Sequence, residues 1–227
     1  MSLALSPSAM TAPVYETKPQ VDSLHYFGPD YCTPERMASY GCQFREIMAF
    51  NPKTVMEVGC GAGVLNFLLN KAGVETKTLD FDRRLKPDLC ASATHLPFRD
   101  KAFDVVGCFQ VLEHLPYELF IPSVRELFRV ARKGVVFSIP DVSRYFHLYI
   151  HAPRLGEHEW MFPINRPGYD LQFSGEHYWE IGWHNITAAR IEQDLKTQGL
   201  LCARHHRSRE YAYHHFFILN RPSLRRD

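Results

Sequence analysis

"VMEVGCGAGV" (residues 55–64) places an apolar run with one acid, Glu57, directly before three glycines. The run ends in a glycine-rich turn and continues into "VLNFLLNKAG" (residues 64–73), which predicts a strand, a tight turn and a helix. Glycines in such a turn let the backbone approach a ligand closely, because no side chain intervenes. The stretch therefore predicts a ligand of the nucleotide type at the end of a strand.

The glycine spacing narrows the class of ligand. Gly59, Gly61 and Gly63 follow GxGxG, whereas the dinucleotide fingerprint GxGxxG would need its third glycine at Val64. Glu57 stands two residues before the first glycine, where a carboxylate is poorly placed beside a pyrophosphate. No Gly-Lys-Ser/Thr follows, so the P-loop pattern fails as well. The turn is predicted to hold a nucleoside without phosphates, and a nicotinamide oxidoreductase is disfavoured.

Strands and helices alternate outward from this turn. Thr33 and Pro34 are the predicted N-cap and first residue of the preceding helix. The predicted strands are residues 53–59, 75–81, 87–93, 103–112, 134–140, 201–208 and 211–220, and the predicted helices are 33–50, 64–73, 117–134 and 187–200. Because the central strands are apolar almost throughout, we expect a parallel sheet covered on both faces.

Two segments lack such a pattern. Residues 1–24 carry three prolines without helical or strand periodicity, which predicts a disordered tail before a single domain over 25–227. Residues 141–184 hold all three tryptophans and five of the twelve histidines and show no clear period. A loop-rich segment of that length is usually functional, so we expect a substrate-side insertion there, although packed aromatic residues are the alternative.

Composition sets further bounds. The 227 residues carry 26 basic and 25 acidic side chains, a formal charge of +1, which gives no strong electrostatic footprint for nucleic acid. The six cysteines form no CxxC pair, and several lie in apolar runs, which favours free thiols in a reducing compartment. No run of 18 apolar residues occurs, so we expect a cytoplasmic protein without a membrane span. The oligomeric state stays open.

Several ordered motifs resemble one known family. "VMEVGCGAGVL" resembles the first motif of class I S-adenosylmethionine-dependent methyltransferases, and "TLDFD" resembles their second. "ASATHLPFRDKAFDVVGCFQVLEHL" and "LFRVARKGVVFSIP" resemble later motifs of the type 11 subgroup. The resemblance implies S-adenosyl-L-methionine as cofactor and an α/β fold: a single doubly wound domain with a seven-stranded, mostly parallel sheet, order 3-2-1-4-5-7-6, the last strand antiparallel, and helices on both faces.

The resemblance also implies roles for individual residues. Asp80 would bind both ribose hydroxyls, and Phe81 would pack on the adenine. Ser92 stands where relatives commonly have an aspartate that accepts a hydrogen bond from the adenine amino group, and a neutral acceptor contributes less than a charged one. The remaining implied contacts are Glu57, Gly59, Cys60, Gly61 and Gly63 at the methionine part, Ala93 and Thr94 at the adenine edge, and Phe109 and Gln110 beside the cofactor.

Three histidines are the candidate catalytic residues. A base for an oxygen acceptor should titrate near neutral pH and lie at the carboxyl edge of the sheet. His114 ends the fourth predicted strand, and His158 and His177 each follow a glutamate and precede a tryptophan by two residues. Glu113 is expected to cap or orient a loop. Ubiquinone-pathway relatives carry a second acid where this chain has Gln110, so no metal is expected.

The implied function is methyl transfer to an oxygen, nitrogen or carbon atom of a small-molecule acceptor. "GEHYWEIGW" (residues 175–183) vaguely resembles methyltransferases of surface-glycan clusters, which favours a sugar or surface-glycan precursor. A quinone or other natural product is the second acceptor class. A non-catalytic partner protein with the same fold is the alternative from a different functional class.

Overall fold

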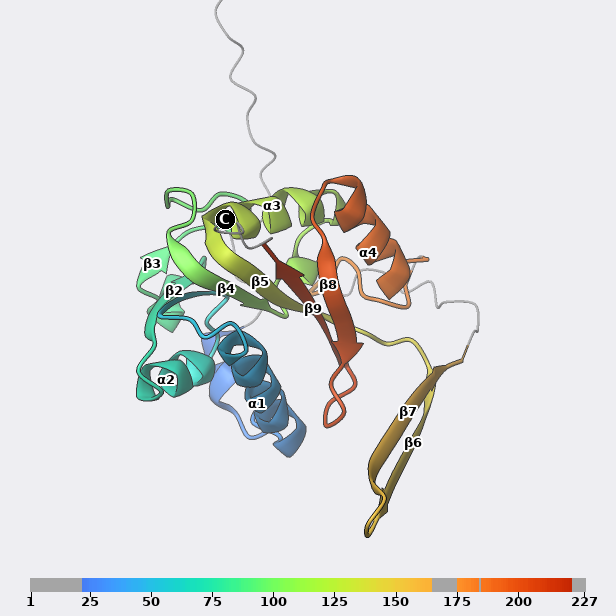
Figure 1. The fold of residues 1–227 in the computed structure, drawn as a ribbon. Helices are drawn as coiled ribbons and strands as arrows, with labels where there is room; N and C mark the ends of the chain where they lie inside the picture. The colour runs from blue at the N-terminus through green and yellow to red at the C-terminus, as the bar shows by residue number, and fades with distance from the viewer. Residues whose placement is uncertain (1–21, 165–174, 184, 222–227) are drawn as a thin grey trace, which may run out of the picture.

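The computed structural model describes residues 22–164, 175–183 and 185–221. Its main sheet has seven strands in the order β3-β2-β1-β4-β5-β9-β8 (Figure 1). The bounds are β1 (Thr54–Val58), β2 (Glu75–Asp80), β3 (Leu89–Cys90), β4 (Phe103–Phe109), β5 (Ala131–Pro140), β8 (Cys202–Arg207) and β9 (His214–Asn220). β1 to β5 are parallel, and β9 is antiparallel to both β5 and β8. β6 and β7 lie outside this sheet. When its seven strands are numbered along the chain, the order is 3-2-1-4-5-7-6, as predicted.

Helices cover both faces of the sheet, as predicted. They are α1 (Pro34–Met48), α2 (Val64–Lys71), α3 (Phe120–Val130) and α4 (Ala188–Thr197), with short 3-10 helices η1 (Ser23–Phe27), η2 (Arg83–Leu85), η3 (Leu112–His114) and η4 (Tyr117–Leu119). Figure 1 shows α1 and α2 on one face and α3 and α4 on the other.

Two apolar cores lie between these layers, because neighbouring residues of a buried strand point to opposite faces. Val55 packs with Ile47 of α1 and Leu65 of α2, while Met56 belongs to the cluster of α3 and α4. All four side chains are fully buried. The continuous apolar runs of the sequence therefore correspond to strands buried on both faces.

The helix ends follow the predicted capping signals. The side chain of Thr33 accepts a hydrogen bond from the Arg36 N–H at the start of α1, and Thr187 does the same for Arg190 at the start of α4. Some boundaries were wrong: the strand predicted over 103–112 ends at Phe109, and the strand predicted over 211–220 begins at His214. The helix predicted over 117–134 ends at Val130, and β5 already begins at Ala131. Ala131 pairs with Phe103 of β4, and this pairing extends the strand toward its amino end.

The segment predicted to be loop-rich contains regular structure. β6 (Tyr145–Ala152) and β7 (Gly156–Pro163) form an antiparallel hairpin that stands away from the main sheet (Figure 1). The pairs Phe146–Phe162 and Leu148–Trp160 share one exposed apolar face. The period was missed because the other face of β6 also carries aromatic residues and histidines, so apolar and polar positions do not alternate clearly.

Two arginines at and just after the end of β8, Arg207 and Arg209, contact the other face of the hairpin. The Arg207 guanidinium lies over the Tyr145 ring at 4.5 Å, and that of Arg209 over Tyr149 at 4.9 Å. Arg209 also forms an ion pair with Glu157 at 3.1 Å. The predicted tail over 1–24 lies mostly outside the described residues; its last two residues belong to η1.

Candidate functional site

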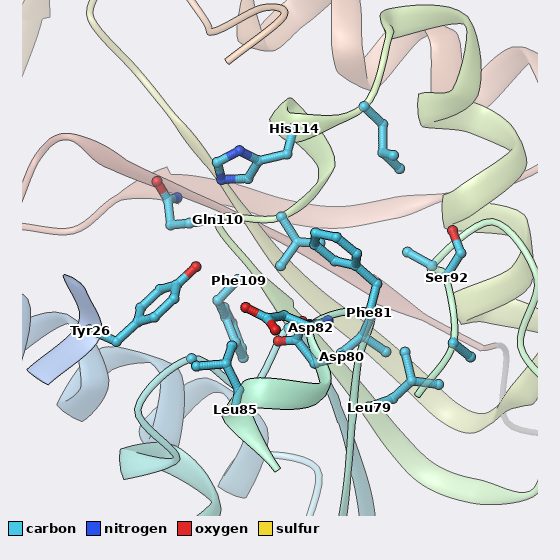
Figure 2. A pocket seen from close by; sticks show the side chains of 17 residues that line it. Tyr26, Leu79, Asp80, Phe81, Asp82, Leu85, Ser92, Phe109, Gln110 and His114 are labelled. Atoms are coloured by element: carbon cyan, nitrogen blue, oxygen red, sulfur yellow. Dashed lines mark hydrogen bonds between the residues drawn. The ribbon is translucent and has the colours of Figure 1, made fainter. Parts of the chain in front are cut away.

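A pocket opens at the carboxyl ends of β1, β2 and β4 (Figure 2). The strand order reverses between β1 and β4, and ligands of open α/β sheets bind at such a switch point. We call it the main pocket. Its lining residues are Tyr26, Val58, Gly59, Gly61, Leu79, Asp80, Phe81, Asp82, Leu85, Ala91, Ser92, Ala93, Phe109, Gln110, Val111, His114 and Leu115.

The glycine turn forms the floor of the main pocket between β1 and α2. Gly59, Gly61 and Gly63 have φ angles of 80°, 47° and 72°, a left-handed backbone that L side chains rarely adopt. A Cβ atom at Gly59 would lie only 2.1 Å from Cγ2 of Val111. Gly59 is therefore required both by its backbone conformation and by the close approach of Val111, the residue that precedes η3. Gly63 caps α2 and does not line the pocket.

Asp80 ends β2 and is 7% exposed. Its two carboxylate oxygens each accept a backbone hydrogen bond, one from the Cys60 N–H and one from the Asp82 N–H, both at 3.0 Å. Burial raises the pKa of Asp80, while these two N–H donors oppose the shift. The Cys60 thiol is a weaker third donor, to Oδ2 at 3.8 Å. A carboxylate has about four acceptor sites, so Asp80 can still accept from a ligand.

The predicted adenine contacts lie on the other side of the main pocket. Phe81, 46% exposed, presents its ring to the cavity in Figure 2, and Ala93 is buried in the lining. Ser92 Oγ lies 2.9 Å from Oγ1 of Thr94, and the Thr94 N–H donates to Ser92 Oγ at 3.3 Å. Thr94 thus supports Ser92 without lining the pocket itself.

Phe109 and Gln110 close the carboxyl end of β4. Gln110 has a φ of 55°, which is uncommon for a residue with a side chain, and strain of this kind gathers at functional sites. Its Nε2 donates to Ser138 Oγ of β5 at 3.0 Å, which holds the side chain at the rim. Phe109, Gln110, Gly59 and Gly61 also border a second cavity.

This smaller pocket adjoins the glycine turn on the α1 side. It is lined by Arg36, Tyr40, Gln43, Glu57, Gly59, Cys60, Gly61, Phe109 and Gln110. Burial raises the pKa of Glu57 to about 8, and its Oε2 has no hydrogen-bond partner within the described residues. A buried carboxylate left in this way can gain from a ligand that brings a hydrogen-bond donor or a positive charge.

This chain is similar in sequence and in fold to known proteins. Residues 56–139, from β1 to β5, match a family model described as a methyltransferase domain. Over these residues the chain is similar to class I S-adenosylmethionine-dependent methyltransferases. Among solved structures, magnesium protoporphyrin IX methyltransferase of Synechocystis with bound S-adenosylhomocysteine superposes with a TM-score of 0.58 at 16% identity, covering 87% of this chain and 92% of that one. At this identity the likeness concerns the fold.

Curated relatives match over shorter stretches. An uncharacterised protein of Methanocaldococcus jannaschii is 31% identical over 93 residues, 38% of this chain and 41% of that protein. The ubiquinone biosynthesis O-methyltransferase of Hydrogenovibrio crunogenus is 26% identical over 87 residues, 32% of this chain and 36% of that protein. The chain thus spans less than half the length of these relatives. Among the described residues, no helix has the length and apolar character to cross a membrane.

Two of the three candidate histidines meet beside the main pocket. His114 lines it, and the His177 ring lies edge-on to the His114 ring with centroids 4.7 Å apart. Burial lowers the pKa of His114 to about 4. The pKa of His177 is raised despite its burial, because Glu180 accepts a hydrogen bond from its Nδ1 at 2.5 Å and Glu113 lies near.

The third histidine lies elsewhere. His158 is on β7 of the hairpin, where its Nε2 lies 3.0 Å from the Leu155 carbonyl and its ring stacks on Trp160. It does not line the main pocket. The tryptophan of the second Glu-His-x-Trp stretch, Trp179, is 1% exposed and packs against Phe120, so the packing alternative applies to that residue.

Three site residues had no strong signal in the sequence. Tyr26 lines the main pocket from η1, directly after the segment predicted to be a tail. Arg36 reaches the smaller pocket from α1, where it looks like an ordinary helix surface position. Glu113 was expected to cap a loop, but the structure buries it completely, and neither carboxylate oxygen has a hydrogen-bond partner within the described residues.

Proposed function

We propose that the chain binds S-adenosylmethionine in the main and smaller pockets and transfers its methyl group to an oxygen atom of a small molecule. The observation that carries the proposal is the pair of buried carboxylates on either side of the glycine turn, Asp80 and Glu57. They suit a ligand that has ribose hydroxyls at one end and a cationic amino group at the other.

The residues present fit such a cofactor. Asp80 retains acceptor capacity for a ribose hydroxyl, and the exposed ring of Phe81 offers a flat apolar surface for an adenine. In the smaller pocket, Glu57 would accept hydrogen bonds from the amino group and Arg36 would pair with the carboxylate. A carboxyl group and a guanidinium group in one pocket match the ammonium and carboxylate groups of an amino acid.

The catalytic side of the proposal rests on positioning. Bound in this place, S-adenosylmethionine supplies an electrophilic methyl group. The chain must hold the acceptor in line with it at close range, and such positioning accounts for much of the rate in displacement reactions. An oxygen acceptor must also lose its proton. We assign the acceptor side of the pocket to His114, which lines it, and to His177, whose ring lies against that of His114.

The relatives give support for the acceptor class. Two of them, from Hydrogenovibrio crunogenus and an Azoarcus strain, are named ubiquinone biosynthesis O-methyltransferases. A solved neighbour from Burkholderia thailandensis, with a TM-score of 0.57 and 12% identity, is named a 1,6-didemethyltoxoflavin N1-methyltransferase. An aromatic hydroxyl acceptor is therefore the first to test. The sugar or surface-glycan precursor rests on residues 175–183 alone and comes second.

Calorimetry with S-adenosylmethionine and S-adenosylhomocysteine tests the cofactor assignment. Asp80→Ala should weaken binding by roughly 1.5–3 kcal/mol, because it removes charged hydrogen bonds to the ribose. Glu75→Ala is the matched control, since Glu75 is an exposed acid at the opposite end of the same strand. Equal affinities of Asp80→Ala and the wild-type chain would overturn the ribose assignment.

Release of S-adenosylhomocysteine tests the transfer itself. Incubation with S-adenosylmethionine and panels of phenols and of sugars should give turnover with one panel. Cofactor binding without turnover on any acceptor would instead favour a non-catalytic partner protein with this fold.

A further inference from the structure

The buried side chain of Glu113 has no partner that explains its place. It belongs to η3 at the rim of the main pocket, it is fully buried, and both carboxylate oxygens lack hydrogen-bond partners within the described residues. Burying a carboxyl group without a partner is strongly unfavourable whether it is charged or protonated. A ligand bound at this site can supply the hydrogen bond or positive charge that the described residues do not give to Glu113.

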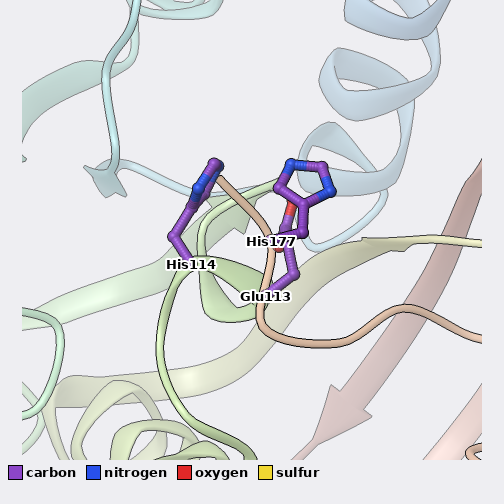
Figure 3. A group of neighbouring side chains, drawn as sticks. All are labelled: Glu113, His114 and His177. Atoms are coloured by element: carbon purple, nitrogen blue, oxygen red, sulfur yellow. The ribbon is translucent and has the colours of Figure 1, made fainter. Parts of the chain in front are cut away.

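Two imidazoles lie beside this carboxylate (Figure 3). One potential ligand atom from each of Glu113, His114 and His177 lies within 4.8 Å of those of the other two. Ligand atoms about 2.0–2.2 Å from a tetrahedral zinc ion are roughly 3.4 Å apart, so a side-chain shift of about 1 Å closes the set.

Hydrogen bonds orient both rings. His114 Nδ1 lies 3.0 Å from the carbonyl oxygen of Glu176, and His177 Nδ1 lies 2.5 Å from Oε1 of Glu180. Both of these oxygens act as acceptors, so each Nδ1 carries the proton. Metal-binding histidines show this arrangement, in which the second nitrogen donates to a carbonyl or carboxylate.

The backbone keeps the two contributing segments together. The Tyr178 N–H donates to the Glu113 carbonyl at 2.9 Å, and Trp179 Nε1 donates to the Leu115 carbonyl at 3.0 Å. Buried Glu180 is held in turn by the Tyr213 hydroxyl, which donates to Oε1 at 3.2 Å. These hydrogen bonds hold the three side chains close together and partly shielded from solvent, although they come from segments far apart in the sequence.

We propose that Glu113, His114 and His177 bind a divalent transition-metal ion of the zinc or iron(II) type at the acceptor end of the main pocket. Two imidazoles and one carboxylate suit such ions, whereas magnesium and calcium prefer sites built from oxygen alone. Gln110 does not argue against the ion, because His177 supplies the third ligand. Three protein ligands leave coordination positions open toward the pocket, which His114 lines.

The chemical role of the ion rests on the proposed methyl transfer, while its binding does not. An acceptor hydroxyl at an open position becomes more acidic and loses its proton to water. Its oxygen then forms the bond to the methyl carbon as the sulfur–methyl bond breaks, which yields the methyl ether, S-adenosylhomocysteine and one proton. An acceptor with two adjacent hydroxyls could occupy two open positions.

Titration of the chelator-treated full chain with Co²⁺ alone tests the site. We expect one ion per chain, visible absorption bands of low-symmetry Co²⁺ and competition by Zn²⁺ but not by Mg²⁺. Glu113→Gln, which keeps the side-chain volume, and His177→Ala should each lower Co²⁺ affinity by more than about 100-fold. Glu180→Gln should lower it by roughly 10–100-fold, the usual effect of a partner that orients a ligand. His151→Ala, an exposed histidine of β6, is the control and should bind like the wild-type chain.

S-adenosylhomocysteine affinity, measured on the same samples, reports folding and separates the two proposals. If the variants bind S-adenosylhomocysteine as tightly as the wild-type chain, their loss of Co²⁺ affinity comes from the missing metal ligand and not from misfolding. Co²⁺ binding without cofactor binding would leave the metal site standing and overturn the proposed function. A wild-type chain that binds no Co²⁺, or Glu113→Gln and His177→Ala variants that bind it as tightly as the wild-type chain, would overturn the metal site.

Discussion

At the scale of single residues, Ser92 is where the chain departs most clearly from the pattern of the methyltransferases that it resembles. Ser92 lines the main pocket at the proposed adenine side, and its hydroxyl is hydrogen-bonded to that of Thr94. Ser92→Asp should tighten S-adenosylhomocysteine binding, because a charged acceptor contributes roughly twice as much as a neutral one. Ser92→Ala should weaken it by about 0.5–1.5 kcal/mol. Calorimetry that shows the aspartate variant binding no better would place Ser92 away from the adenine amino group.

The glycine turn allows a second test, with a control inside the same motif. Gly59→Ala adds a left-handed alanine and a Cβ atom 2.1 Å from Val111, whereas Gly63→Ala adds the same strain with nothing within 4 Å. We expect Gly63→Ala to cost roughly 1–2 kcal/mol of unfolding free energy, and Gly59→Ala clearly more. Urea denaturation measures both. Val111→Ala should restore part of the loss in Gly59→Ala alone; no restoration would mean that backbone strain dominates.

At the scale of elements, the region after β5 depends on one buried acid. Asp141 is 6% exposed and pairs with Arg207 at 2.5 Å and with His215 at 2.8 Å. These contacts connect the start of the hairpin segment to β8 and β9. Asp141→Asn should cost roughly 3–5 kcal/mol of unfolding free energy, because it leaves a largely buried guanidinium without its charged partner. A loss below about 1 kcal/mol would show that the pair contributes little.

The same acid predicts how stability depends on pH. Asp141 has a lowered pKa in the folded chain, because its hydrogen bonds to His215 and Ser143 and the charge of Arg207 outweigh its burial. Its contribution is therefore fully present above the unfolded value of about 3.9 and is lost as pH falls through the folded value. Burial also lowers the pKa of His215, which adds a loss in the same direction below about pH 6.5. In Asp141→Asn, the unfolding free energy should therefore fall less steeply with decreasing pH in the acid range than in the wild-type chain.

At the scale of the whole molecule, cofactor binding should be visible in thermal unfolding. A ligand that binds only the folded state at 100 times its dissociation constant adds about 2.7 kcal/mol. For a chain of this length each kcal/mol corresponds to roughly 2–4 °C, so we expect S-adenosylhomocysteine to raise the Tm by about 5–10 °C. Asp80→Ala should show less than half of that shift at the same ligand concentration. An unchanged Tm in the wild-type chain would contradict the cofactor site.

The sequence by itself determined the main sheet and the cofactor side of the pocket. Continuous apolar runs mark strands buried on both faces, and the glycines with Glu57 and Asp80 stand within a few residues of the strand ends that position them. These features are local, since a turn, a cap or a strand end depends on residues adjacent in the chain. The strand order followed from the family resemblance and agrees with the structure.

Only the tertiary structure brought together the residues of the proposed acceptor side. His114 and His177 are 63 positions apart in sequence and meet because Tyr178 and Trp179 bond to the backbone around η3, while His158, in a nearly identical stretch, lies on a separate hairpin. The hairpin itself was hidden because its two faces are both rich in aromatic residues. Contacts between distant segments depend on packing across the fold, and the same short motif can therefore take two different places.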